Sequence, residues 1–205
     1  MYKSYKILNS VKIFFICTQI TYVFLFSACS LLPTTSNLDK DYVAKSSDAL
    51  IVIGVNERYR IMFSPGTYDS EISKIGQFLV APLHLFPENG YIIAKLPPLN
   101  EGEAYAISQV MPRGILARYS VDGGVFVPCD NISTLSFNTI KGQIIYLGDV
   151  IFNRKEGYLS MSFDSNVEKA RQFLKTEYPS YTDKLKVGKT KVLPTTFRCK
   201  LIVKY

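Results

Sequence analysis

The chain holds one histidine, His84, and it is the first residue to test for chemistry. A catalytic triad needs such a base beside an activated nucleophile. The glycine–any–serine–any–glycine spacing of a nucleophile elbow does not occur in the sequence. A zinc site made from His84, Cys129 and Cys199 would lack the paired ligand spacings of zinc sites. We therefore interpret His84 as a loop or core histidine, and we predict no metal, no cofactor and no catalytic residue.

Carboxylate pairs are the second candidate chemistry, because two Asp or Glu side chains can hydrolyse a glycosidic bond. Asp122, Asp149 and Asp164 fall in predicted turns or at strand ends, where Asp commonly hydrogen-bonds its own backbone. A turn role is the simpler interpretation. An envelope hydrolase that uses dispersed Asp and Glu residues remains the alternative function.

The N-terminal residues have the order of a secretory signal peptide. Lys3, Lys6 and Lys12 precede an apolar run from Ile13 to Phe26, and the small residues of Ser27-Ala28-Cys29 follow. The run is short for a membrane span, which needs about 20 apolar residues. An ordinary signal cut elsewhere and an uncleaved anchor are the alternatives to the more specific interpretation given next.

A cysteine placed directly after two small residues makes this segment resemble a bacterial lipoprotein signal. The resemblance implies that the Cys29 thiol receives a diacylglycerol, that the chain is cut before Cys29, and that the new N-terminus is acylated. Two or more acyl chains hold a protein stably on a bilayer. In Gram-negative members an Asp after the cysteine retains the protein in the inner membrane, so Ser30 implies the outer membrane, facing the periplasm or the cell surface.

Export would place the two remaining cysteines, Cys129 and Cys199, in an oxidising compartment. Of the four cysteines in the sequence, Cys17 belongs to the signal and Cys29 carries the lipid. We predict a Cys129–Cys199 disulfide, which would stabilise the domain by about 4 kcal/mol in the chain-entropy model. Two separate buried thiols are the alternative.

The charge of the chain is only mildly positive once the signal is removed. Residues 1–28 hold three of the 24 Lys and Arg and none of the 17 Asp and Glu, so the remainder carries a charge of +4. The sequence has no clustered Lys and Arg stripe of the kind that binds nucleic acid. We expect no nucleic-acid partner; the expected partners are the membrane, through the lipid, and an envelope protein or polymer.

Residues 30–47 contain several Pro, Ser, Thr and Asn residues and no periodicity. We therefore divide the chain into a signal peptide (1–28), a lipidated cysteine with a flexible tether (29–47) and one domain (48–205). The domain is rich in short β-branched and aromatic runs that predict strands. These runs are 50–55, 59–63, 78–80, 91–96, 104–108, 115–121, 125–127, 135–137, 143–152, 158–163 and 197–203.

Turns, a bulge and one helix between these runs complete the predicted fold. Pro65-Gly66 and Asp122-Gly123-Gly124 predict turns, and Gly148 predicts a bulge in its strand. An amphipathic helix is predicted from a cap at 164–166 to Tyr178, because Pro179 restricts the residue before it. The fold class is mainly β: an antiparallel β-sandwich with one amphipathic α-helix near the C-terminus.

A second resemblance concerns Lys141 to Asp149, a glycine followed by an aliphatic-Tyr-aliphatic-Gly-Asp strand. It is similar to uncharacterised bacterial lipoproteins with an Ig-like or carboxypeptidase-regulatory-like β-sandwich, in which a helix that ends on a Tyr-Pro pair often follows, as Tyr178-Pro179 does here. The resemblance implies the fold and no reaction.

Six tyrosines fall within predicted strands, either as core filling or as an exposed row that binds sugars or a partner protein: Tyr59, Tyr91, Tyr105, Tyr119, Tyr146 and Tyr158. The sequence thus predicts a membrane-anchored envelope lipoprotein that acts as a non-enzymatic binding or structural module. A glycan hydrolase is the alternative.

Overall fold

The computed structural model describes residues 37–56, 59–78, 83–112, 126–155 and 158–197. All of them belong to the second of two units in the chain, Thr35–Tyr205, and the description below concerns this unit alone. The predicted strand 115–121, the turn at 122–124 and most of the closing strand 197–203 lie outside the described residues.

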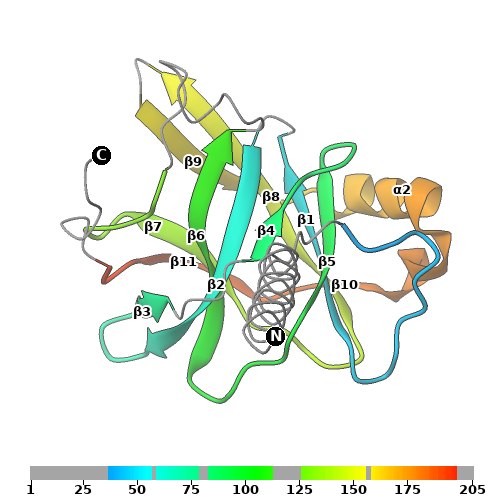
Figure 1. Cartoon of the computed structure of the whole chain (residues 1–205), viewed down its shortest axis with the longest axis horizontal. Coiled ribbons are helices and arrows are strands. Elements are labelled where there is room, and N and C mark those ends of the chain that lie inside the picture. Colours follow the sequence, from blue (N-terminus) through cyan, green and yellow to red (C-terminus); the bar gives the residue numbers. More distant parts are fainter. Residues whose placement is uncertain (1–36, 57–58, 79–82, 113–125, 156–157, 198–205) are drawn as a thin grey trace, which may run out of the picture. The chain divides into compact units, whose positions relative to one another are not determined.

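Two sheets form the described part of the fold (Figure 1). Sheet A has the order β10-β8-β1-β5, with β9 paired to β8, and sheet B has the order β11-β7-β6-β2-β3, with β4 paired to β2. The strands are β1 (Ala49–Val55), β2 (Tyr59–Asp69), β3 (Lys74–Phe78), β4 (Leu83–Leu85), β5 (Tyr91–Leu96), β6 (Glu103–Pro112), β7 (Ser133–Phe137), β8 (Ile144–Lys155), β9 (Tyr158–Asp164), β10 (Leu185–Val187) and β11 (Thr190–Pro194). The predicted mainly-β sandwich is confirmed.

The apolar runs explain which strands are central. Every residue of β1 is buried, because its side chains alternate between two cores. Ile51 and Ile53 join the core between the two sheets, whereas Leu50 and Val52 face the helix on the outer side of sheet A. A strand with two apolar faces is excluded from an edge, and β1 lies between β8 and β5.

Sheet A departs from the expected antiparallel order. β8 and β9 form the predicted antiparallel hairpin, but β1 and β10 both pair with β8 in parallel. Leu50, Ile144 and Leu185 therefore stand side by side at the beginnings of three parallel strands. The predicted bulge is confirmed, since Gly148 has a φ of +99° and the β1–β8 register shifts beside it.

The predicted helix is confirmed as α2 (Val167–Glu177). Asn166 caps it, because its Oδ1 accepts a hydrogen bond from the Lys169 backbone N–H at 3.0 Å. Ala170 and Leu174 bury the apolar stripe against sheet A. The helix ends before Pro179, where the short 3₁₀ helix η3 (Pro179–Lys184) begins.

Pro65-Gly66 was predicted to end a strand, and this prediction is wrong: both residues lie inside β2. On one side of β2, β4 pairs with Ile61–Phe63 and β3 pairs from Gly66 onward. Pro65 falls between these two partners, so the N–H that proline lacks is not needed there.

The segment 37–48, which we name the strap, differs from the expected tether. Asn37 is buried, and its side chain donates to the Phe86 carbonyl and accepts from the Ile93 N–H, both at 3.0 Å. The Leu38 N–H donates to the Ile93 carbonyl at 2.9 Å. The strap therefore occupies the free edge of β5, so the described part of the predicted tether, residues 37–47, is held on the domain.

Two tyrosines at the end of α2 and in η3 hold the strap from the other side. Tyr178 donates its hydroxyl to the Leu38 carbonyl at 2.6 Å, and Tyr181 donates to the Tyr42 carbonyl. Burial raises the pKa of Tyr178 to about 12, which keeps its hydroxyl a donor. Lys40 of the strap also pairs with Glu177.

We predict that Tyr178→Phe and Tyr181→Phe each lower the free energy of unfolding by about 1 kcal/mol, because each leaves a strap carbonyl without its donor. Urea unfolding measures the loss. The control is Tyr59→Phe, whose hydroxyl makes no hydrogen bond to the described residues. Equal stability of the double variant Tyr178→Phe/Tyr181→Phe and the control would contradict the strap contacts.

Candidate anion-binding pocket

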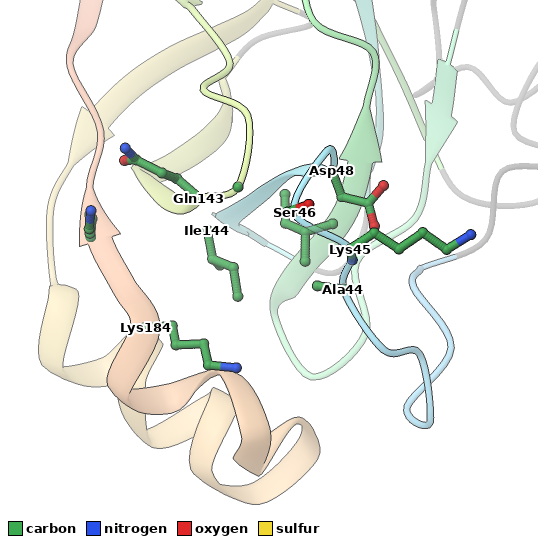
Figure 2. Close-up of a pocket in the computed structure, with 10 residues that line it drawn as sticks. Ala44, Lys45, Ser46, Asp48, Gln143, Ile144 and Lys184 are labelled. Atoms are coloured by element: carbon green, nitrogen blue, oxygen red, sulfur yellow. Dashed lines mark hydrogen bonds between the residues drawn. The ribbon is translucent and has the colours of Figure 1, made fainter.

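A pocket of about 380 Å³ opens where the strap meets the beginnings of β1, β8 and β10 (Figure 2). We call it the strap pocket. One wall is the end of the strap, and the opposite wall is the junction of η3 with β10. Its lining residues are Ala44, Lys45, Ser46, Asp48, Leu50, Gly142, Gln143, Ile144, Lys184 and Lys186.

The parallel strands and one glycine turn explain why the pocket forms here. Leu50 and Ile144 begin adjacent strands and make an apolar floor. The turn before β8 places Gly142 at a φ of +71°, which glycine adopts without strain. The Gly142 N–H donates to the Asp48 carbonyl at 2.7 Å, and a Cβ at Gly142 would come within 3.1 Å of the Ser46 carbonyl oxygen. A glycine therefore lets the strap lie close to β8.

The carboxylate of Asp48 is fully engaged within the domain. It accepts hydrogen bonds from the Tyr42 hydroxyl at 2.6 Å and the Lys45 backbone N–H at 2.7 Å, and it pairs with the Lys95 ammonium at 2.6 Å. The Lys95 ammonium, followed by the other two donors, holds the pKa of Asp48 well below its ordinary 3.8. Asp48 in turn raises the pKa of Lys95.

The lysines of the strap pocket are not neutralised in this way. Within the described part of the chain, the ammonium groups of Lys45, Lys184 and Lys186 have no ion-pair or hydrogen-bond partner. Figure 2 shows Lys184 extending toward the strap across the pocket, whereas Lys45 points away from it. Lys184 and Lys186 are thus the cations best placed to hold an anion, with Ser46 and Gln143 as further hydrogen-bonding groups.

A second polar cluster lies near the other end of β1, between sheet A and α2. Asp149 is the register partner of Gly54 in β1 and of Asp164 in β9. A Cβ at Gly54 would come within 1.8 Å of the Asp149 Oδ1, so only glycine leaves room for this carboxylate. The Asp149 Oδ1 and the Tyr91 hydroxyl are both buried without a hydrogen-bond partner among the described residues.

Burial dominates the electrostatics of this cluster. It raises the pKa of Asp149 above the ordinary 3.8, against the opposing effects of the Tyr146 hydroxyl and the Lys169 charge. Burial also raises the pKa of Tyr91 to about 12. A carboxyl with a raised pKa can act as a general acid, but the Oδ1 of Asp149 is enclosed in the helix–sheet interface. The position favours a structural role.

One of the two cysteines of the predicted disulfide, Cys129, belongs to the described residues. Cys129 is disulfide-bonded, and because it is the only cysteine among the described residues, its partner lies outside them. The Asp130 N–H donates to the Phe197 carbonyl at 2.7 Å, so the chain leading to Cys199 runs beside Cys129. The Cys129–Cys199 pairing itself stays a prediction, and Cys29 and Asp122 also lie outside the described residues.

The remaining sequence candidates fall into the sheets. His84 belongs to β4, where its backbone pairs with Met62 of β2. Tyr91, Tyr105 and Tyr146 are buried, which confirms core filling at these positions. Across the described residues, no group of three or more His, Cys, Asp or Glu could hold a metal ion. In the same residues, no helix is long and apolar enough to span a membrane.

Comparison with known proteins identifies no relative of this chain: no protein family, no curated protein and no solved structure matches it significantly.

We predict that Asp149→Asn raises the thermal midpoint at pH 7 by about 3 °C, equivalent to about 1 kcal/mol. Because folding raises the pKa of Asp149, its contribution to stability is complete below pH 3.8 and is lost as the pH rises through the folded-state value. The rise in thermal midpoint caused by Asp149→Asn should therefore become smaller as the pH is lowered toward 3.8. The exposed Asp183→Asn is the control, and an equal gain at both pH values would argue against the buried carboxylate.

Proposed function

We propose that the protein is a lipid-anchored, non-enzymatic module of the cell envelope that binds an anionic group in the strap pocket. The unpaired ammonium groups of Lys184 and Lys186 on one wall of a defined pocket carry this proposal. A phosphate or carboxylate in the pocket can accept hydrogen bonds from these ammonium groups, and hydrogen bonds between charged groups are the stronger ones. The Asp48 carboxylate, although it lines the same pocket, does not neutralise these two lysines, because it already pairs with Lys95.

The anchoring part of the proposal is supported by the sequence. Ser27-Ala28-Cys29 follows a charged and then apolar segment, as in bacterial lipoproteins. The proposed site of residence is the outer membrane, with the domain on the periplasmic side or at the cell surface, and the proposed attachment is the acyl groups at Cys29.

Titration with inorganic phosphate at low ionic strength, followed by amide NMR shifts of β10, tests the pocket. We predict that Lys184→Gln and Lys186→Gln each weaken phosphate binding by up to about fivefold, the effect expected for one exposed ion pair. The double variant Lys175→Gln/Lys189→Gln removes the same charge outside the pocket and is the control. An equal loss in the double variants Lys184→Gln/Lys186→Gln and Lys175→Gln/Lys189→Gln would show that only net charge matters and would overturn the pocket, as would the absence of a saturable shift in the wild type.

Metabolic labelling with palmitate tests the anchor. We predict that label enters the wild type and Cys17→Ser but is absent from Cys29→Ser, because only the Cys29 thiol is the proposed acceptor. Labelling of the Cys29→Ser variant at the wild-type level would show that the lipid is attached elsewhere.

A further inference from the structure

We infer that the anion bound in the strap pocket is the phosphate headgroup of an anionic phospholipid in the same leaflet that holds the N-terminal lipid. This inference rests on the proposed function, and it selects one source of phosphate, the membrane surface, over a soluble anion. Three observations support it: the short linker left by the strap, two exposed valines next in sequence to pocket-lining residues, and ion pairs that neutralise other lysines but leave Lys184 and Lys186 unpaired.

The strap shortens the distance that the domain can move from its anchor. From Asn37 on, the chain is held on the domain by its contacts with Ile93, Phe86 and Tyr178. Only residues 30–36 then separate Cys29 from the domain, and such a segment spans at most about 25 Å when fully extended. A free tether through residue 47 would span more than about 55 Å. The docked strap therefore keeps the domain near the bilayer.

The strap also forms one wall of the pocket. The chain that leaves the anchor enters the domain at Asn37 and reaches the pocket at Ala44 to Asp48. The pocket is thus built partly from the segment that is closest in sequence to the lipidated cysteine.

On each wall, an exposed valine is the sequence neighbour of a residue that lines the pocket. Val43, next to Ala44 on the strap, is 80% exposed, and Val187, next to Lys186 on β10, is 62% exposed. They are the two most exposed of the large hydrophobic side chains in the described part of the chain. A soluble phosphate gains nothing from valines, whereas the boundary between headgroups and acyl chains accepts apolar side chains beside lysines.

The charge pattern agrees with a membrane-facing site. Lys40 pairs with Glu177 and Lys95 with Asp48, while Lys184 and Lys186 remain unpaired. An unpaired lysine close to an anionic membrane surface strengthens association about fivefold, and the effect decays within a Debye length. The short linker keeps the domain close to the membrane surface, where this electrostatic attraction acts.

The test is lysine acetylation of the full lipidated protein, purified in detergent and reconstituted in vesicles, with each lysine quantified by mass spectrometry. We expect Lys184 and Lys186 to react about fivefold more slowly on phosphatidylglycerol vesicles than on phosphatidylcholine vesicles. Lys175 and Lys189 should react equally on both. In Val43→Ser/Val187→Ser the difference between vesicles should fall, while protection by added inorganic phosphate should persist; Ile72→Ser/Val192→Ser, at exposed positions outside the pocket, is the control.

The outcomes separate the two proposals. Protection by inorganic phosphate with equal reactivity on both kinds of vesicle would overturn the lipid inference and leave the anion-binding function standing. Protection by neither phosphate nor phosphatidylglycerol would overturn both. If the valine variant kept the full difference between vesicles, simple electrostatic attraction would explain the data and the headgroup site would be wrong.

Discussion

The docking of the strap through Asp48 is the interaction on which the rest of the site depends. Its carboxylate, whose side chain is 2% exposed, joins the Tyr42 hydroxyl, the Lys45 backbone and the Lys95 ammonium of β5. A buried carboxylate is costly unless it is paired and hydrogen-bonded, and here it has three partners. This arrangement fixes the last turn of the strap at the entrance of β1. It acts together with the hydrogen bonds from Tyr181 to the Tyr42 carbonyl and from Gly142 to the Asp48 carbonyl, which hold the same wall of the pocket.

Local patterns predicted the elements of the fold that depend on neighbours in the sequence. The strand at β1, the β8–β9 hairpin, the bulge at Gly148 and the amphipathic helix that ends before Pro179 follow from apolar runs, turns and caps. The parallel pairings of β8 did not follow, because no local signal says which strand meets which. The strap is not predicted for a similar reason: its polar residues resemble a linker, and its partners elsewhere in the domain lie 47 to 140 positions away.

The candidate site was harder to predict than the fold. Lys45 and the pair Lys184 and Lys186 belong to opposite ends of the chain, and only the parallel order β10-β8-β1 brings their elements together. In the sequence, no pattern distinguishes lysines that line a pocket from the lysines of an ordinary solvated surface. Asp149 was visible in the sequence, beside Gly148, but a turn role could not be told from burial. The decisive residue was Gly54, which makes room for the carboxylate and is distant in sequence.

The two ends of β1 show how solvent exposure decides what an unpaired charge can do. The Oδ1 of Asp149 is buried near Gly54, and burial raises the pKa of this carboxyl, so that it holds a proton more tightly. Lys184 and Lys186 lie at the opposite end in contact with water, where an unpaired ammonium costs little free energy. They can therefore remain charged and unpaired until an anion arrives. The same solvation makes a lone phosphate a weak ligand, since water competes for every contact. Tight binding consequently needs a further contribution. In the proposed arrangement, anchoring beside an anionic bilayer provides it, because it raises the effective concentration of phosphate headgroups at the pocket.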